Sequence, residues 1–294
     1  MPELPDVVVY VEHLERRLAG HTLERIRLLN PFVLRSVDPP LASAEGKKVV
    51  RLRRMGKRIV IELERGLFLV LHLMIAGRLR WLAKDEKPPG RISLAAFEFA
   101  DCVLVLTEAG TKRRASIHLV EGEAALAQMD PGGIEVLEAS PEQFAGRLKR
   151  ENHTLKRALT DPHLFSGIGN AYSDEILHRA KLSPFAQTVS LSEKDVKRLY
   201  EAARATLVEW TERLRQQSGA DLPEKVTAFH EEMAVHGRYR KPCPVCGSPV
   251  QRIVYAENET NYCARCQTGG RILADRALSR LLKASWPRSI DELE

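Results

Sequence analysis

The sequence predicts an α+β protein in which a β-rich half precedes a largely helical half. Apolar or alternating runs typical of sandwich strands recur through the first half. They lie at residues 26–29, 49–52, 59–63, 67–73, 79–82, 94–99 and 103–107. From residue 140 onward the apolar residues recur at three- and four-residue steps, which indicates helices. The 294 residues are enough for two domains.

The chain begins Met1-Pro2-Glu3, and an amphipathic helix is expected over residues 4–19. Removal of Met1 would leave Pro2 as a secondary amine, and an α-amino group has a pKa of about 7.7–8.0, well below that of lysine. Such an amine can attack an aldehyde-like carbon and form a Schiff base, and the carboxylate of Glu3 can move protons beside it. Alternatively, these residues only begin the helix.

Two loops of the β-rich half carry clustered cations. Residues 53–58 read RRMGKR and contain Lys57, and Arg113 and Arg114 follow Lys112 after the turn at Gly110. Together with the net charge of +6, two basic loops in one domain predict an edge that faces phosphates. The alternative is a pair of ordinary solvated turns.

The helical half contains a glycine-rich turn, GIGNAYSDEILHRA, at residues 167–180. Gly167 and Gly169 permit a tight backbone path, and Asn170 is placed to cap or lead the helix that follows. Exposed amides at a helix start bind anions, so this turn predicts a phosphate contact. A helical hairpin that needs two glycines for its geometry is the alternative. Further helices are expected at residues 141–150, 155–160 and 192–217.

Four of the five cysteines form two Cys-x2-Cys pairs separated by sixteen residues. Cys243, Cys246, Cys263 and Cys266 therefore predict one structural zinc ion with four thiolate ligands. We expect a β-hairpin here, formed by residues 250–255 and 261–263 with its tip at 257–260. Two disulfides are the alternative, which a cytoplasmic location disfavours.

The remaining features concern the fifth cysteine and the cellular location. Cys102 lies in an apolar run and is expected to be an inert core thiol. The chain has no uninterrupted apolar run of about 18–20 residues, and Pro2, Glu3 and Asp6 do not fit a secretory signal. We therefore expect a cytoplasmic protein, acting as a monomer.

Three motifs in this order resemble one known family. The start MPELPD, the turn GIGNAYSDE and the terminal CPVCG and YCARCQ segments are similar to those of the formamidopyrimidine-DNA glycosylase/endonuclease VIII family of base-excision repair enzymes. The resemblance covers residues 1–267. It implies a β-sandwich domain with a leading catalytic helix, then a helix-two-turn-helix domain with a zinc β-hairpin, and double-stranded damaged DNA as the partner.

The resemblance also implies roles for individual residues. Pro2 becomes the Schiff-base nucleophile, Glu3 the acid/base, and Lys57 a phosphate contact near the lesion. The implied activity is bifunctional: a damaged base is displaced, and the strand is then nicked by elimination. The other residues implied to contact DNA are Arg113, Arg114, Gly167, Gly169, Asn170 and Asn258.

Four positions depart from the family pattern. Asn258 aligns with an arginine at the hairpin tip, Ala115 with a wedge phenylalanine, and Ile75, next to Met74, with a void-filling methionine. Asp6 stands where glutamate is usual. These departures keep open a catalytically altered or inactive protein that binds abasic sites. A zinc-containing transcription factor is a third alternative, in which an exposed Pro2 would serve no purpose.

We expect domains at residues 1–130, 131–240 and 241–268, with the linker at 131–139, and an extension at 269–294. Within this extension one side of a helix is expected to be apolar, through Ile272, Leu273, Leu278, Leu281 and Leu282. We favour a cap that packs on the zinc hairpin over a helix that binds a partner.

Overall fold

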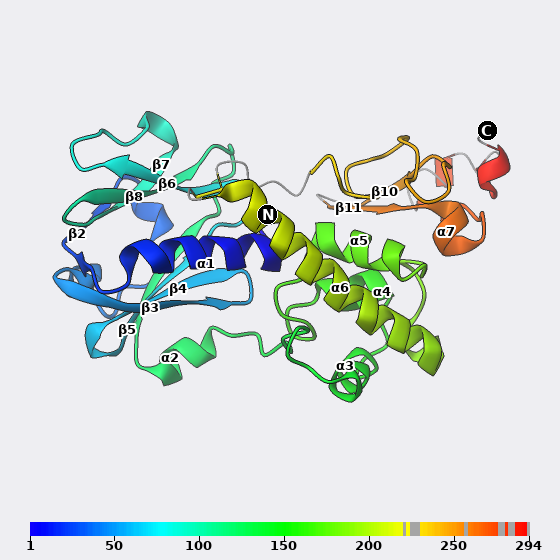
Figure 1. Cartoon of the computed structure of the whole chain (residues 1–294), viewed down its shortest axis with the longest axis horizontal. Coiled ribbons are helices and arrows are strands. Elements are labelled where there is room, and N and C mark those ends of the chain that lie inside the picture. Colours follow the sequence, from blue (N-terminus) through cyan, green and yellow to red (C-terminus); the bar gives the residue numbers. More distant parts are fainter. Residues whose placement is uncertain (220–221, 224–229, 256–257, 276–279, 282–285, 293–294) are drawn as a thin grey trace. The chain divides into compact units, whose positions relative to one another are not determined.

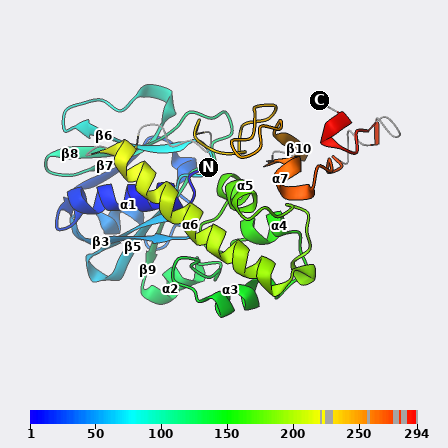
Figure 2. The same cartoon turned by 45° about the vertical axis from the view of Figure 1, so that its right-hand side comes forward.

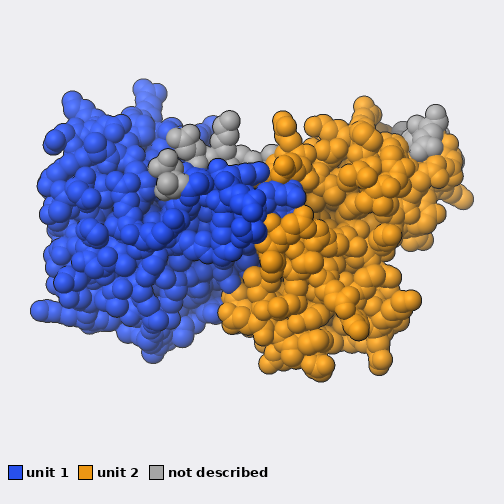
Figure 3. Space-filling view, viewed as in Figure 1, with its two compact units in different colours: residues 1–131, 210–227 blue, residues 132–209, 228–294 orange. Residues whose placement is uncertain are grey.

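A computed structural model describes the chain except for residues 220–221, 224–229, 256–257, 276–279, 282–285 and 293–294. It divides into two compact units, coloured separately in Figure 3. Unit 1 comprises Met1–Pro131 and Trp210–Thr227, and unit 2 comprises Gly132–Glu209 and Ala228–Glu294. Helix α6 (Glu193–Ser218) contributes residues to both units. No helix in the described part of the chain is long and apolar enough to cross a membrane.

Unit 1 is built on two antiparallel sheets (Figure 1). The first has the order β1-β3-β4-β5-β9 and the second β2-β7-β8-β6. Their strands are β1 (Thr22–Leu23), β2 (Arg25–Leu28), β3 (Lys47–Met55), β4 (Arg58–Leu63), β5 (Leu67–His72), β6 (Gly77–Ala83), β7 (Ser93–Glu98), β8 (Cys102–Glu108) and β9 (Ser116–Glu121). Apolar side chains from both sheets share one core, so the predicted β-sandwich is confirmed.

Helix α1 (Leu4–Leu18) closes this core at one side and packs against β3, as Figures 1 and 2 both show. Val7, Tyr10 and Leu14 are fully buried, which is the face that the three- and four-residue spacing predicts. Cys102 is also buried in the core, and burial raises the pKa of its thiol, as expected for an inert residue. The short helix α2 (Glu123–Gln128), which the sequence pattern did not indicate, follows β9.

The helices of unit 2 are α3 (Pro141–Leu148), α4 (Leu155–Thr160), α5 (Asn170–Arg179) and the first part of α6. Side-chain oxygens set two of the helix starts, because Ser140 accepts from the backbone N–H of Gln143 and Thr154 from that of Arg157. The rings of Phe144, Phe165 and Tyr200 meet between α3 and α6, with centroid separations of 4.8 and 5.4 Å. The helices expected at 141–150, 155–160 and 192–217 are thus present with end shifts of at most two residues.

The C-terminal part of unit 2 contains the hairpin of β10 (Gln251–Tyr255) and β11 (Asn258–Tyr262), followed by α7 (Ala264–Thr268). The predicted tip at 257–260 is wrong, because Asn258 already pairs with Tyr255 in the ladder. The expected extension helix is also wrong at its start, since residues 271–275 are not helical, while Leu278 and Leu282 lie outside the described residues. Ile272, Leu273 and Ile290 instead pack with Ile253 and Tyr262, so the extension caps the hairpin.

Candidate active site and zinc centre

The N-terminal residues are packed into unit 1 at the start of α1. Pro2 is buried and Glu3 is 2% exposed. Glu3 and Asp6 form a capping box, in which the Glu3 backbone N–H donates to the Asp6 carboxylate over 2.8 Å. The capping box fixes the Glu3 backbone directly beside Pro2, which is what an acid/base next to an N-terminal nucleophile requires.

The electrostatics of this region connect the N-terminus with Lys57. Burial lowers the pKa of the Met1 ammonium. The charges of Glu3 and Asp6 raise this pKa, and those of Arg78 and Lys57 lower it. Burial also raises the pKa of Asp6 to about 7. Glu3 and Lys57 are thus among the charges that act on the Met1 amine. Because its pKa is lowered, this amine keeps a larger share of its unprotonated, nucleophilic form.

Lys57 occupies a two-residue turn with Gly56 between β3 and β4, whose ladder ends at the pair Met55 and Arg58. Gly56 has φ 59°, the left-handed conformation that such tight hairpin turns require. Arg54 and Arg58 donate to backbone carbonyls, Gly56 O at 2.6 Å and Met129 O at 2.5 Å. The basic turn is therefore a rigid hairpin, and it presents Lys57 at its end.

The second basic loop connects β8 and β9. Buried Glu108 fixes its backbone, since the N–H groups of Arg114 and Ala115 both donate to its carboxylate, at 2.9 and 3.0 Å. The Arg113 side chain donates to the carbonyl of Arg91 at 2.6 Å. Arg113 thereby lines a surface groove of about 740 Å³ together with Arg27, Leu29, Lys87, Pro88, Gly90, Arg91 and Ser93. The positive charge predicted for this loop is thus extended by Arg27 of β2 and by Lys87 and Arg91 from the segment before β7.

Sequence reasoning did not single out His72, which lies opposite Arg58 at the end of β5 and so next to the Lys57 hairpin. Burial and the nearby cations Arg58 and Lys57 lower its pKa to about 4, which keeps the ring neutral. Its Nε2 is buried with no hydrogen-bond partner in the described part of the chain. A single histidine at the end of an apolar strand carries no sequence signal that separates it from a core residue.

Two of the departures from the family pattern have clear structural consequences. Ala115 is 3% exposed and belongs to the sandwich core, so this position contributes no wedge to a DNA stack. Ile75, in contrast, is 54% exposed, and it follows Met74, whose φ of 52° lies in the left-handed region. An apolar side chain is therefore still presented from this turn, but it is shorter and stiffer than methionine.

In unit 2 the glycine-rich turn leads into α5. Gly167 has φ 77°, which favours glycine, whereas Gly169 is the N-cap residue with an extended backbone. The helix begins at Asn170, and no side chain caps it. Of the two expected roles of Asn170, capping the helix is wrong and leading it is confirmed, because Asn170 is the first helical residue. Its side chain is not consumed by capping.

The start of α5 is anchored by a buried charged network that sequence reasoning missed. Lys156 donates to the carbonyl of Asn170 and to the carboxylate of Asp174, both at 2.6 Å. The other oxygen of Asp174 contacts His236 Nδ1 at 2.8 Å and accepts from the Asn261 backbone at 3.1 Å. Asp174 therefore links α4, the segment before the first cysteine, and the zinc hairpin.

The neighbouring carboxylate of Glu175 binds the backbone of the segment before the first cysteine, at residues 234–236. It accepts from the N–H groups of Ala234, Val235 and His236 at 2.7 to 2.9 Å. Burial raises the pKa of Glu175, and these three amides oppose that effect. Both acids stand in the glycine-rich motif, but their partners lie outside it, from Lys156 at 18 residues to Asn261 at 87 residues from Asp174, and could not be read from it.

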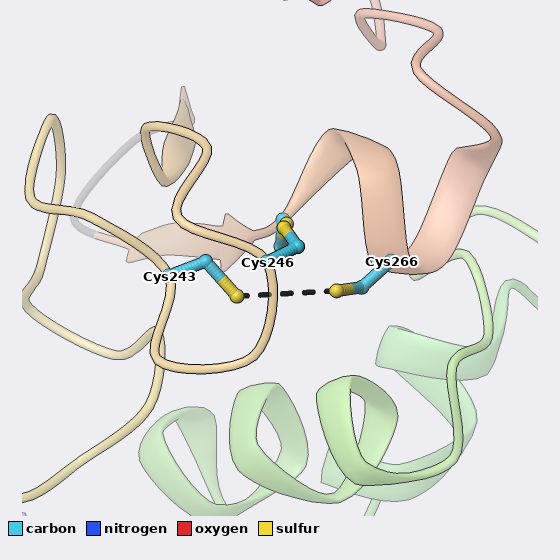
Figure 4. Close-up of side chains that lie close together, drawn as sticks. Cys243, Cys246 and Cys266 are labelled. Carbon is cyan, nitrogen blue, oxygen red and sulfur yellow. Dashed lines mark hydrogen bonds between the residues drawn. The ribbon is translucent and has the colours of Figure 1, made fainter.

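The four predicted zinc ligands come together. Their sulfur atoms all lie within 4.8 Å of one another. The sulfurs of Cys243 and Cys266 are 3.9 Å apart (Figure 4), and those of Cys246 and Cys263 are 3.4 Å apart. A disulfide requires about 2.05 Å. Zinc–sulfur bonds of about 2.3 Å in a tetrahedron give sulfur separations of about 3.8 Å, so the donor set fits one structural zinc ion. His178 Nε2 lies 3.3 Å from Cys243 Sγ and orients that ligand from α5.

Asn258 is exposed and opens strand β11 opposite Tyr255. It therefore lies beside the hairpin turn, where the family has an arginine. An amide at this position supplies neither the positive charge nor the planar fork of a guanidinium.

Comparison with protein families identifies the class to which this arrangement belongs. Residues 1–115 match the formamidopyrimidine-DNA glycosylase N-terminal domain, residues 134–219 its H2TH domain, and residues 240–269 the zinc finger found in FPG and IleRS. These three matches define a zinc-containing DNA glycosylase. The chain belongs to the formamidopyrimidine-DNA glycosylase family, whose members are glycosylases and AP lyases.

Individual relatives agree with this assignment. The formamidopyrimidine-DNA glycosylase of Thermus thermophilus is 34% identical over 278 residues, which are 92% of this chain and 100% of the relative. That of Heliobacterium modesticaldum is 32% identical over 280 residues, with 91% and 100% covered. The crystal structure of the MutM (Fpg) protein from Thermus thermophilus superposes with a TM-score of 0.76 at 31% identity, over 90% of this chain and 98% of that one.

The Lactococcus lactis glycosylase non-covalently bound to AP-site DNA has the same fold. Its TM-score is 0.79 at 24% identity, with 90% of this chain and 99% of that chain covered. A second structure of the Lactococcus lactis protein, in complex with DNA that contains an abasic site, superposes with a TM-score of 0.80 at 24% identity.

Proposed function

We propose that the chain is a bifunctional DNA glycosylase and AP lyase of base-excision repair, that acts as a monomer on double-stranded damaged DNA in the bacterial cytoplasm. Pro2 is the nucleophile, Glu3 the acid/base, and Lys57 a phosphate contact. The observation that carries the proposal is the start of α1, where Glu3 is buried and where Glu3 and Lys57 both act electrostatically on the amine of the N-terminal residue, Met1. A protein that only binds damage would have no use for this arrangement.

In this mechanism the Pro2 nitrogen attacks C1′ of the damaged nucleotide and the base departs with a proton. The ring oxygen O4′ accepts a proton from Glu3 as the sugar opens, which leaves an iminium between Pro2 and C1′. The iminium makes the C2′ hydrogens acidic. Loss of one of them as a proton forms a double bond between C1′ and C2′, and the resulting enamine expels the phosphate from C3′. The nucleotide must first leave the stack, which costs a few kcal/mol.

Phosphate contacts from unit 1 come from Lys57, Arg113 and Arg114, and those from unit 2 from the turn with Gly167, Gly169 and Asn170. Gly167 supplies the turn, and the amides after Gly169 stand at a helix start with its partial positive charge. The proposed contact by Asn258 is a weaker, uncharged one. We infer that unstacked lesions are preferred. Ala115 cannot fill the gap left by an extruded nucleotide, and Asn258 cannot replace a guanidinium on a phosphate or on the orphaned base. Abasic sites should react faster than 8-oxoguanine paired with cytosine in single-turnover assays.

Borohydride trapping tests the nucleophile directly. We would prepare the protein as an N-terminal fusion whose cleavage leaves Pro2 as the first residue, and compare the same sample before and after cleavage on an abasic duplex. A covalent complex is expected only after cleavage. Trapping that is equal in both samples would exclude Pro2, and Lys57→Ala would then test the lysine as the nucleophile. Binding without any trapping would favour the alternative, an inactive abasic-site binding protein.

A further inference from the structure

Two arginines of the zinc-bearing segment lie against one tyrosine. The guanidinium carbon of Arg252 lies 4.6 Å from the ring centroid of Tyr239, and that of Arg240 lies 5.2 Å from it. Both distances are within the range of a cation–π interaction. All three residues are exposed, so the two guanidinium groups are held on a rigid aromatic surface while they remain accessible.

The backbone of Arg240 is in a conformation that favours glycine. Its φ is 66°, in the left-handed region, and its N–H donates to the Val250 carbonyl at 2.9 Å. Glycine would adopt this conformation without strain. An arginine that keeps a strained backbone and places its charge on a tyrosine indicates a role for its side chain.

The arginine cluster, formed by Tyr239, Arg240 and Arg252, is rich in positive charge. Arg240 and its neighbour Lys241 form no ion pair with any residue in the described ranges. Arg252 faces one carboxylate, Glu259, at 3.6 Å, and that carboxylate also accepts from the Asn261 side chain at 3.0 Å. Among the described residues, three cations thus stand near one acid, Glu259, which pairs with Arg252. This excess of positive charge leaves the cluster able to bind an anion.

The zinc module sets the position of both arginines. Arg240 precedes the first ligand, Cys243, by three residues, and Arg252 lies in β10 opposite Asn261 of β11. Asn261 is in turn bonded to Asp174 of α5, the helix that begins with Asn170. The cluster is therefore built into the same rigid frame as the proposed phosphate contacts of unit 2.

We propose that Arg240 and Arg252, ordered by Tyr239, form a phosphate-binding site for the DNA backbone. The proposal rests on the proposed function, in that the ligand is the DNA of the same reaction. Planar guanidinium groups bind phosphate oxygens through two parallel hydrogen bonds, and stacking on an aromatic ring orients them in advance. The site supplies to the zinc module the positive charge that Asn258 does not provide.

Two matched variants test this site. Arg240→Gly relieves the positive φ and removes one charge, so the fold and zinc content should be retained. Arg65→Gly is the control, because Arg65 is exposed, has φ 64°, and lies in the short 3-10 turn (Glu64–Gly66) before β5, in unit 1. The two changes are identical in charge and backbone effect and differ only in place.

Binding of each protein to an abasic duplex would be measured by fluorescence anisotropy over a series of salt concentrations. Arg240→Gly should weaken binding roughly tenfold at low salt and reduce the log–log salt slope by about 0.9, the loss of one phosphate contact. Arg252→Gln should act in the same direction, while Arg65→Gly and Tyr239→Phe should match the wild type. Zinc content and melting temperature are recorded for every variant.

The possible failures can be distinguished. If the wild type binds and is trapped by borohydride but Arg240→Gly equals Arg65→Gly, the arginine cluster is structural and the inference is wrong while the proposed function stands. If Arg240→Gly weakens binding without a change in salt slope, the cluster does not contact phosphate, and the inference is equally wrong. If the wild type neither binds nor is trapped, the proposed function itself fails.

Discussion

Helix α1 follows the proposed site residues Pro2 and Glu3, and helix α5 begins at the proposed site residue Asn170. Each buries an aspartate near its start, and the two carboxylates differ in how many partners they have. Asp6 in α1 is fully desolvated, and among the described residues only the N–H of Glu3 donates to it. Asp174 in α5 contacts Lys156, His236 and Asn261. Asp174, with several partners, joins distant segments. Asp6 has only one N–H partner among the described residues, and burial raises its pKa to about 7, which favours its protonated form.

We expect the Asp174 network to contribute strongly to the free energy of unfolding of unit 2. Asp174→Ala leaves the Lys156 ammonium buried at 3% side-chain exposure without its counter-ion, and such changes cost about 3–5 kcal/mol. The control is Glu209→Ala in α6. This change removes an exposed ion pair with Arg179, which lies in α5 as Asp174 does, and should cost at most about 1 kcal/mol. Urea unfolding of both variants measures the difference, and equal losses would contradict the network.

Asp6 should make stability depend on pH in the opposite sense to an ion-paired carboxylate. Its folded pKa of about 7 exceeds the ordinary value of 3.8, so between these values the folded state holds a proton that the unfolded state has lost. Stability contributed by Asp6 is therefore present below about pH 4 and is lost as the pH rises to about 7, by roughly a few kcal/mol.

Asp6→Asn removes this dependence, because an amide keeps the acceptor for the Glu3 N–H and does not ionise. The difference in melting temperature between variant and wild type should grow in favour of the variant from about pH 5 to about pH 8. His72, whose pKa is lowered to about 4, destabilises the folded state in acid but does so equally in both proteins, so it cancels in the difference. A difference that is constant with pH would show that Asp6 is ionised throughout.

The contrast also shows which parts of the molecule can be predicted from the sequence. Most strands and helices and the zinc ligands follow from local spacing, since Cys243 and Cys246 are three residues apart and their partners repeat the same motif. Strand β9 and helix α2 were not predicted. Asp174 stands in a motif that was recognised, yet its partner Asn261 lies 87 residues away. The effect of Asp6 was missed for a different reason, because burial of a polar residue depends on tertiary packing that a periodic pattern does not report.

The smallest effect on stability is expected from Glu3, where the comparison separates chemistry from structure. Glu3→Gln keeps the size and the acceptor oxygen of the side chain, so the capping box with Asp6 should remain and stability should change by less than about 1 kcal/mol. The amide does not transfer a proton, however. Release of a damaged base with opening of the sugar ring should therefore slow by about 10²–10⁴.

An abasic site reacts differently, because part of it already exists as an open-chain aldehyde. Schiff-base formation by Pro2 on this substrate needs no ring opening, so borohydride trapping by Glu3→Gln should persist. Single-turnover base excision and trapping would be measured side by side, with Glu24→Gln, an exposed position of the same unit, as the control for the lost charge. If the Glu3 variant loses both activities in proportion, Glu3 positions the amine and does not transfer the proton to the sugar. If it loses excision alone, the start of α1 supplies a proton at O4′, whereas the acid in α5 supplies only structure.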